Sequence, residues 1–210
     1  MSSSLPSALV LLDYFGIAVF AISGALVAAE RRLDFVTFVF FAVVTGVGGG
    51  TLRDLLIGAP VFWVRTNGTL MICIVAAALV WIDHQRRLAG RAILWFDAAG
   101  MTAYSAYGAA KALSFGVAPL PAFLMGVLTA CAGGIIRDVL AREPSVLLRR
   151  ELYVTPAALS AGLFVALAVG GAGVSLAAAV AVSAGFALRA LAIVRGWSLP
   201  GYRGSGDDDA

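Results

Sequence analysis

The chain has 210 residues, of which 61% are hydrophobic and only 13% are charged, and its mean hydropathy is +0.95. This composition excludes an ordinary soluble domain, in which about 25% of the residues are charged, and the net charge of +3 gives no indication of nucleic-acid binding. We predict an all-α integral membrane protein, because several stretches approach the ~20 apolar residues that a helix needs to cross a bilayer.

The first half of the chain contains three predicted membrane spans. Residues 7–29 form an apolar run interrupted by Asp13, and residues 35–57 form a second run. The third run, residues 69–82, has only 14 residues, and length alone does not separate a short span from a buried segment. No basic region or cleavage site precedes the first run, so we interpret it as a span and not as a removed signal peptide.

The second half contains four more predicted spans. Residues 92–113 and 121–141 form two of them, separated by the proline-containing stretch SFGVAPLP. Residues 152–188 are apolar over 37 positions, which corresponds to about 55 Å of helix. This segment is too long for one span and is expected to fold back at the glycine-rich residues 170–173, giving spans six and seven.

The basic residues outside the spans predict the orientation of the chain. The seventh span is expected at about 174–195 and a disordered polar tail at 199–210. The arginines then gather on one side, and the positive-inside rule puts the N-terminus outside and the C-terminus in the cytoplasm, in the cell inner membrane. That side carries Arg31, Arg32, Arg86, Arg87, Arg91, Arg142, Arg149, Arg150, Arg195 and Arg203, and the other side carries Arg65 and Lys111.

An internal repeat relates the two halves of the chain at an offset of 84 residues, without a gap. The first unit covers about 8–83 and the second about 92–168. Each unit has three spans, an odd number, so the second unit must enter the membrane in the opposite direction, as in inverted-repeat channels and transporters. The seventh helix is then an unpaired addition. The matching residues include Asp13 and Asp97, Gly16 and Gly100, Thr45 and Thr129, and Pro60 and Pro144.

A glycine and Arg-Asp motif occurs once in each unit, as GGGTLRDLL in span two and AGGIIRDVL in span five. Each glycine costs about 1 kcal/mol of helix propensity relative to alanine, so Gly48, Gly49 and Gly50 predict a kink or a locally opened backbone. Opened carbonyls are tolerated only where protein or water satisfies them, which indicates a cavity. The alternative is that glycines such as Gly46 and Gly50 only allow close helix packing. The second copy has Gly133 and Gly134, with Ala132 at the position of Gly48.

Two Arg-Asp pairs follow the glycines, at Arg53 and Asp54 and at Arg137 and Asp138. An arginine near the middle of a bilayer costs from ~3 to more than 10 kcal/mol, so it must face the protein interior, water or a partner. The pairs are expected to form local or crosswise ion pairs and to line a pathway. The alternative is that they are inert salt bridges that lock the bundle.

Five further polar residues fall inside the predicted spans. Asp13 and Asp97 lie early in spans one and four, where a carboxylate can raise the local cation concentration at a channel mouth. They are equally suited to capping helices or pairing with arginines. Ser23, Thr45 and Thr129 offer hydroxyl groups for partly dehydrated ions.

The remaining polar and sulfur-containing residues indicate no other chemistry. Lys111, the only lysine, and Arg189 lie near span ends, where we expect snorkelling side chains, with an ion pair as the alternative for Arg189. Cys73 and Cys131 are expected to be buried thiols, and His84 a surface residue. We find no enzyme motif, and we expect no cofactor, no tightly bound metal and no nucleic-acid partner.

Together, the duplicated three-span unit, GGGTLRD and AGGIIRD resemble the TRIC family of trimeric intracellular cation channels, in its prokaryotic branch. The resemblance covers about 8–195. It implies a homotrimer in membrane lipid, with one monovalent-cation pore in each protomer, mainly for potassium, between kinked spans two and five. It assigns the pore and gate to Gly48, Gly49, Gly50, Arg53, Asp54, Gly133, Gly134, Arg137 and Asp138, with transient K⁺ and Na⁺ as the permeating ions.

Two other functions remain compatible with the sequence. Inverted repeats with broken helices are also typical of carriers, and the same bacterial domain has been labelled a glycine transporter, so a carrier for glycine or another small neutral amino acid is the first alternative. The second is a non-conducting membrane scaffold. Because no TVGYG-type carbonyl filter is present, we expect little discrimination between potassium and sodium.

Overall fold

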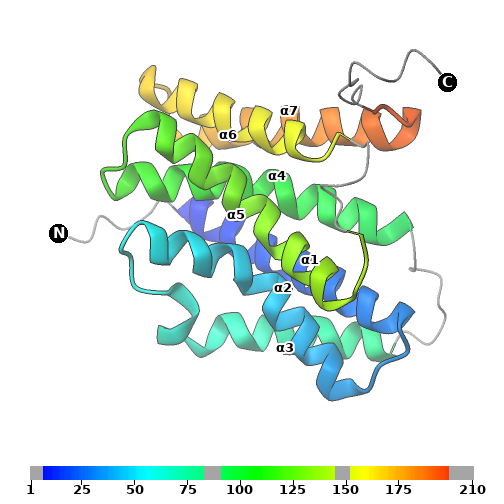
Figure 1. Cartoon of the computed structure of the whole chain (residues 1–210). Helices are drawn as coiled ribbons and strands as arrows, with labels where there is room; N and C mark the ends of the chain where they lie inside the picture. Colours follow the sequence, from blue (N-terminus) through cyan, green and yellow to red (C-terminus); the bar gives the residue numbers. More distant parts are fainter. Residues whose placement is uncertain (1–6, 83–90, 145–151, 199–210) are drawn as a thin grey trace, which may run out of the picture.

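The computed structural model describes residues 7–82, 91–144 and 152–198, which form seven α-helices and one short 3-10 helix (Figure 1). The seven predicted spans are confirmed, including the turn at residues 170–173. The helices are α1 (Ser7–Glu30), α2 (Phe35–Leu56), η1 (Phe62–Arg65), α3 (Asn67–Ile82), α4 (Arg91–Ser114), α5 (Pro119–Leu140), α6 (Val154–Val169) and α7 (Val174–Arg195).

The helices differ in how well each could cross a bilayer alone. By length and hydropathy α1, α2, α5 and α7 qualify, whereas α3 and α6 have 16 residues each. Sixteen residues span about 24 Å, less than the ~30 Å of a typical hydrocarbon core. The two short helices hold the same position, third, in the two repeats, so this length is a shared property of the repeat.

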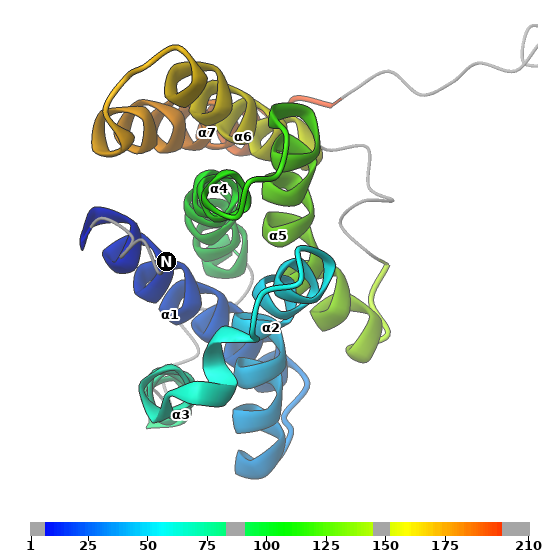
Figure 2. The same cartoon turned by 90° about the vertical axis from the view of Figure 1, so that its left-hand side faces the viewer.

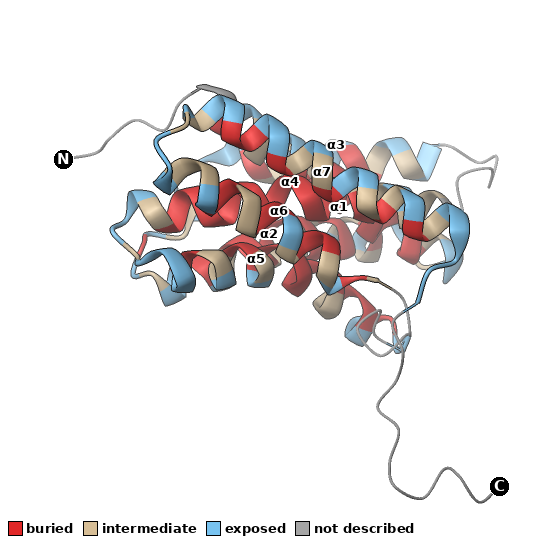
Figure 3. Cartoon of the chain, turned by 90° about the horizontal axis from the view of Figure 1, so that it is seen from above, coloured by how far each residue is buried: buried red, intermediate tan, exposed pale blue. Residues whose placement is uncertain are grey.

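Helix α4 forms the centre of the bundle and packs against α1, α5, α6 and α7 (Figure 2). Its side chains are buried along most of its length, and the outward faces of the peripheral helices carry the exposed residues (Figure 3). Because protein and not lipid surrounds α4, this helix can carry more polar residues than an isolated span. Its central place explains why α4 is not among the helices that are apolar enough to span by themselves.

The turns at the helix ends repeat the internal duplication. Arg32 and Gly116, which follow α1 and α4, adopt φ values of 54° and 79°, and Gly58 and Arg142, which follow α2 and α5, adopt 67° and 53°. Residues 84 positions apart therefore share a left-handed backbone. Each turn is closed by a backbone bond of the Schellman type, for example from the Ala59 N–H to the Asp54 carbonyl. An arginine adopts this conformation less readily than a glycine, so the surrounding fold imposes the turn.

The first helices of the two repeats cross with two-fold symmetry. A Cβ on Gly16 would collide with the ring of Tyr104, and a Cβ on Gly100 would lie 3.2 Å from the ring of Phe20. Phe20 and Tyr104 are themselves equivalent in the repeat, and their rings meet edge to face at 5.5 Å between centroids. This reciprocal pattern is what an axis between oppositely oriented repeats produces.

The second helices, α2 and α5, cross with the same symmetry. A Cβ on Gly49 would collide with the carbonyl oxygen of Thr129, and a Cβ on Gly133 would lie 2.6 Å from the carbonyl oxygen of Thr45. Only a residue without a side chain allows the two backbones to come this close. The inverted repeat predicted from the sequence is thus present in the packing.

We expected either a kink or a locally opened backbone at the glycines, and the opened backbone is wrong. Although α2 changes direction along its length in Figure 2, both α2 and α5 are uninterrupted α-helices through Gly48–Gly50 and Gly133–Gly134. Gly48, Gly49 and Gly133 lie against the opposing helix. Gly50 instead makes room for the Phe62 ring, and Gly134 for the Tyr153 hydroxyl. The packing alternative therefore accounts for them. Each helix keeps its own backbone hydrogen bonds. Because Gly49 and Gly133 have no side chain, the two helices can also approach each other to backbone contact.

Several predictions fall on residues outside the described ranges. This group consists of His84, Arg86, Arg87, Arg149, Arg150 and the tail at 199–210 with Arg203. Arg91 begins α4, but its side chain is also outside the description. Helix α2 begins after Asp34, whose carboxylate accepts hydrogen bonds from the Thr37 N–H and hydroxyl, at 3.0 and 2.8 Å. These bonds favour the ionised form and lower the pKa of Asp34 below its usual value.

Replacing Gly49 or Gly133 by alanine is expected to destabilise the protein, because the new methyl group would push α2 and α5 apart. The expected loss is about 1–3 kcal/mol, typical of overpacking, measured as reversible unfolding or as a lower melting temperature in detergent. Gly68→Ala in α3 is the matched control, since a Cβ there meets nothing within 4 Å, and alanine favours the helix by up to about 1 kcal/mol. Equal stability of all three variants would contradict a close crossing.

Candidate functional site

Two groups of buried charged residues lie at the C-terminal ends of α2 and α5. Arg53 and Arg137, at 1% and 2% exposure, are among the largest fully buried side chains of the described chain. Arginine is almost never buried without a partner. The arrangement around each guanidinium group therefore determines what this part of the bundle can do.

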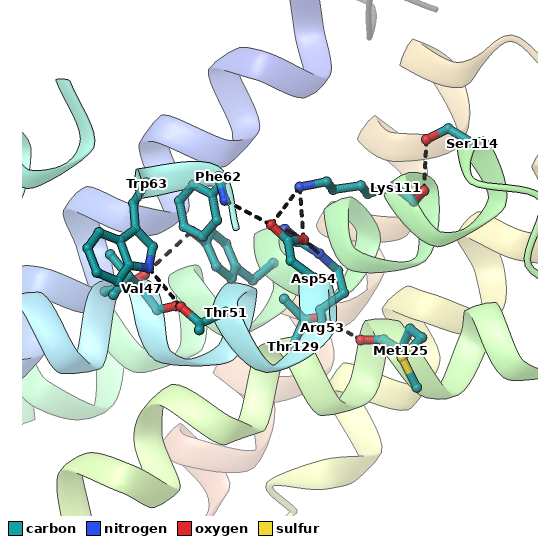
Figure 4. Close-up of polar contacts among 12 residues, drawn as sticks. Val47, Thr51, Arg53, Asp54, Phe62, Trp63, Lys111, Ser114, Met125 and Thr129 are labelled. Carbon is teal, nitrogen blue, oxygen red and sulfur yellow. Dashed lines mark hydrogen bonds and ion pairs between the residues drawn. The ribbon is translucent and has the colours of Figure 1, made fainter. Parts of the chain in front are cut away.

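Cluster one consists of Arg53, Asp54, Lys111 and Phe62 and joins α2, α4 and the start of η1 (Figure 4). Asp54 Oδ1 accepts from Arg53 Nε at 2.8 Å and lies 2.7 Å from Arg53 Nη2. The Lys111 ammonium lies 2.8 and 2.9 Å from the two oxygens of the same carboxylate, and the Phe62 N–H donates to Oδ2 at 3.1 Å. One carboxylate thus serves two cations and a backbone amide.

Aromatic rings complete the surroundings of cluster one. The Arg53 guanidinium carbon lies 5.0 Å from the centroid of Tyr107 and 6.0 Å from that of Phe62, and Lys111 Nζ lies 5.6 Å from Phe62. Cations at these distances gain from the negative ring faces. Even so, Nη1 of Arg53 has no hydrogen-bond partner among the described residues, so cluster one is not fully satisfied.

The predicted snorkelling of Lys111 is wrong. Its side chain points into the bundle and pairs with Asp54 of the other repeat, and the whole residue is only 8% exposed. The physical reason is that Asp54 is fully buried and Arg53 contacts only its Oδ1, so the second carboxylate oxygen needs donors from elsewhere in the bundle. Sequence position near a span end could not reveal this contact, since it joins residues 57 positions apart.

Cluster two consists of Arg137, Asp138, Asp97 and Ser23, from α5, α4 and α1. Arg137 donates from Nε and Nη2 to Asp138 Oδ1 at 2.9 and 2.8 Å, and from Nη1 to Asp97 Oδ1 at 2.8 Å. The same Nη1 also donates to the hydroxyl of Ser23. One guanidinium group here serves two carboxylates, the reverse of cluster one.

Tyr153 and Arg189 lie next to cluster two. A Cβ on Gly134 would lie 2.6 Å from the Tyr153 hydroxyl, so this glycine makes room for the phenol. Arg189 lies with its guanidinium carbon 5.6 Å from the Tyr153 ring centroid and donates to the Leu152 carbonyl at 2.8 Å. Arg189 is 1% exposed, so the predicted snorkelling of its side chain is wrong. Its guanidinium group instead packs inside the bundle against Leu152 and Tyr153, the residues just before α6.

The two clusters are equivalent in the repeat but differ at two facing positions. Each arginine reaches across to the first helix of the other repeat, Arg53 to Tyr107 and Arg137 to Ser23, and these two partners are 84 residues apart. Lys111 has Val27 as its equivalent, so cluster two has no amine. The inverted repeat therefore holds two charge clusters of different composition.

The structure brings together most of the residues predicted for the site. Asp97 and Ser23 both bind Arg137. For Asp97, pairing with an arginine was one of the alternatives that the sequence left open. Thr45 and Thr129 are buried at the α2–α5 crossing, and the Thr129 hydroxyl donates to the Met125 carbonyl in its own helix. Asp13, which is only partly buried, lies beside Tyr104 and Tyr107 and in the field of Arg53. The additions that the sequence did not identify as site residues include Lys111, Phe62, Tyr107 and Tyr153.

In this conformation the crossing is sealed. Both guanidinium groups are inaccessible and paired with carboxylates, and the backbones of α2 and α5 touch at Gly49 and Gly133. Within the described ranges no group of three or more histidine, cysteine, aspartate or glutamate side chains could hold a metal ion. The chemistry available here is electrostatic, through buried ion pairs.

Sequence comparisons place the chain among bacterial membrane proteins. The family model described as "Glycine transporter" matches residues 10–85 and 94–169, one match for each repeat. The UPF0126 membrane protein of Vibrio cholerae is 43% identical over 169 residues, which cover 78% of this chain and 70% of that protein. The UPF0126 inner membrane protein YadS of Escherichia coli K12 is 44% identical over 147 residues, which cover 69% and 71%.

Solved structures with the same fold are cation channels. The chain is similar to the TRIC trimeric intracellular cation channel orthologue of Rhodobacter sphaeroides, with 43% identity, a TM-score of 0.85 and coverage of 91% of this chain and 100% of that one. A prokaryotic TRIC channel crystallised in 0.5 M KCl matches with 30% identity and a TM-score of 0.83, covering 91% and 98%.

Asp97→Asn is expected to destabilise the protein strongly, because it leaves part of the positive charge of Arg137 buried without its counter-ion. Removing one partner of a buried pair costs about 3–5 kcal/mol. The matched control is Glu143→Gln, which breaks the Arg31–Glu143 pair, whose side chains are 42% and 43% exposed, and which should cost no more than about 1 kcal/mol. Unfolding of the purified proteins in detergent measures both, and similar losses would contradict the structural role of cluster two.

Proposed function

Because the chain belongs to the TRIC family of cation channels, in its prokaryotic branch, we propose that it is a potassium-permeable channel for monovalent cations. Its solved relatives are ion channels, so the chain is not an enzyme. It is a multi-pass membrane protein of the inner-membrane type found in the related YadS protein.

The proposed pathway runs through each protomer between α2 and α5. The observation that carries this proposal is the pair of buried Arg-Asp clusters, placed by the inverted repeat at the two ends of a glycine crossing. Buried charges inside a membrane bundle are energetically costly, and packing alone does not require them. Such residues commonly mark ion pathways. The described conformation is then a closed one, and opening separates α2 from α5 and exchanges ion-pair partners for water and ions.

The proposed selectivity is for cations over anions, with weak preference between potassium and sodium. Four carboxylates, Asp13, Asp54, Asp97 and Asp138, lie along the pathway and favour cations. The hydroxyl groups of Ser23, Thr45 and Thr129 can replace some water ligands of an entering ion. A rigid ring of backbone carbonyls would discriminate more strongly, but the helices α2 and α5 keep their carbonyls in their own hydrogen bonds.

The proposed assembly is a homotrimer in membrane lipid, with the N-terminus outside and the C-terminus in the cytoplasm. Its relatives are trimeric channels by name, and the exposed apolar faces of α1, α2, α3 and α7 offer area for lipid and for neighbouring protomers. The orientation rests on the segregation of the arginines in the sequence.

A glycine carrier is the second candidate, because the matching family model bears that description. Inverted-repeat carriers hold a substrate carboxylate at the N-terminal end of a half-helix in a broken span. Helices α2 and α5 are unbroken, so the crossing offers glycine no such helix terminus. The structure therefore favours the channel.

Purified protein in planar bilayers is expected to give unitary currents carried by potassium. Under a potassium/sodium gradient the reversal potential should lie near zero, because selectivity between the two is weak, and under a KCl gradient it should approach the potassium equilibrium potential. Glycine uptake into liposomes without unitary currents would support the carrier instead. Absence of both activities would favour a scaffold.

Arg53→Ala and Arg137→Ala are each expected to change unitary conductance or open probability by about threefold or more, since each removes a charge from the proposed pathway. Arg31→Ala removes an exposed arginine and is the matched control, expected to change currents little. Currents that are the same in both buried variants and the wild type would confine these arginines to packing.

A further inference from the structure

We propose that the seventh helix carries a binding site for the phosphate group of an anionic membrane lipid, in a cavity between the C-terminal end of α7 and the start of α4. The repeat does not account for α7, and the proposed pathway between α2 and α5 does not include this cavity. Binding of the lipid is therefore separate from conduction, and the two can be tested independently.

The cavity is built by a turn at the end of α7. Gly196 adopts a left-handed backbone with a φ of 64°, and the Trp197 N–H donates to the Ala192 carbonyl at 3.1 Å. This turn brings Trp197 and Ser198 into the wall of the cavity, opposite Leu94 of α4. The cavity has a volume of about 150 Å³, which gives room for a phosphate group.

A buried arginine forms part of the same wall. Arg189 lines the cavity although the residue is only 1% exposed. Its Nη1 donates to the Leu152 carbonyl at 2.8 Å, and its guanidinium carbon lies 5.6 Å from the Tyr153 ring centroid. These contacts fix the orientation of the guanidinium group. Its planar fork of N–H donors matches the oxygens of a phosphate group, and hydrogen bonds between ionised partners are the strong ones.

The start of α4 closes the other side of the cavity. Trp95 of α4 and Phe186 of α7 contact each other with 6.2 Å between their ring centroids, which holds the two helices together here. Leu94 lies in the first turn of α4, at the positive end of that helix dipole, whereas the last turn of α7 carries a negative end. The two dipoles oppose each other, and the charges of Arg189 and Arg195 then favour an anion.

The position of the cavity favours a lipid over a soluble anion. It lies at the end of a span, where the headgroups of a bilayer begin. Trp197 is 40% exposed and lies 5.4 Å, at its ring centroid, from the guanidinium carbon of Arg195, and tryptophan is enriched in this layer. Leu94 and Ile193 add half-buried apolar side chains to the wall. These groups suit the first carbons of an acyl chain, and a free phosphate ion gains nothing from them.

The experiment adds phosphatidylglycerol, phosphatidylcholine or sodium phosphate, at matched ionic strength, to the whole purified chain in a neutral detergent. The melting temperature is measured, since a ligand of the folded protein raises it, and native mass spectrometry counts the bound lipids. Phosphatidylglycerol is expected to reach half-saturation at a concentration about fivefold or more below that of phosphatidylcholine, because Arg189 and Arg195 repel the cationic choline group. Sodium phosphate is expected to have no effect.

Ser198 offers a matched pair of variants, because it is exposed and lies in the wall of the cavity. Ser198→Glu places a negative charge beside the phosphate group and is expected to raise the half-saturating concentration of phosphatidylglycerol by about fivefold or more. Ser198→Gln has nearly the same size without the charge and should leave this concentration within about twofold of the wild type.

Arg189→Lys and Arg189→Gln test the buried donor. Lysine keeps the charge without the planar fork, so the preference for phosphatidylglycerol should fall, and glutamine should abolish it. Arg65→Gln is the control, because it removes an exposed arginine from η1, at the other end of the bundle from the cavity (Figure 1). If the Arg189 variants fold poorly, the Ser198 pair decides.

Equal binding of phosphatidylglycerol and phosphatidylcholine by the wild type would overturn the site. The same half-saturating concentration in Ser198→Glu and Ser198→Gln would also overturn it. Stabilisation by sodium phosphate equal to that by phosphatidylglycerol would overturn the lipid as the source of the phosphate group. None of these measurements involves a current, so a negative result here leaves the proposed channel intact, and a silent channel leaves the lipid site intact.

Discussion

The fold depends on one constraint, which is that a charge inside an apolar bundle must be neutralised where it lies. Arg53 and Arg137 cannot reach water, so each pairs with the aspartate that follows it and with groups from other helices, which supply a further carboxylate, a hydroxyl group and an aromatic ring. This requirement ties α2 to α4 and α5 to both α1 and α4. The glycine contacts between α2 and α5 allow these ties to form, because they bring the helices to within backbone contact.

The inverted duplication explains the geometry, and its exceptions explain how the two ends can act differently. The crossings at Gly16 and Gly100 and at Gly49 and Gly133 are reciprocal, as are the left-handed turns after the first two helices of each repeat. The two clusters differ at two pairs of positions that are equivalent in the repeat. Lys111 corresponds to Val27, and Tyr107 corresponds to Ser23. A symmetric scaffold with asymmetric charge suits a passage whose two sides face different solutions.

Much of the fold could be predicted from the sequence, because hydropathy and the repeat are both properties of local residue order. The short third span was identified only through the repeat, and α3 confirms it. The contacts of the site were harder to predict. The bond between Lys111 and Asp54 joins residues of different repeats, and nothing in the position of a lone lysine near a span end reveals which way its side chain points.

The glycines show why composition alone was ambiguous. Helix propensity treats Gly48–Gly50 as a weakness in the helix, whereas in the structure the helix stays intact and the same residues allow close packing, Gly48 and Gly49 against α5 and Gly50 against Phe62. Propensity describes an isolated helix, and tertiary packing decides between the two outcomes. The choice between an opened backbone and a close crossing required the position of the opposing helix, which the sequence does not contain.

The polarity of α4 also bears on how the protein is made. A segment with so few lipid-facing apolar residues gains little from entering the bilayer alone, and its aspartate and lysine add to the cost of insertion. Its stable place depends on helices already present to cover it. Biogenesis of this chain is therefore cooperative: α1 provides one wall before α4 leaves the translocon, and α5 to α7, synthesised later, retain it.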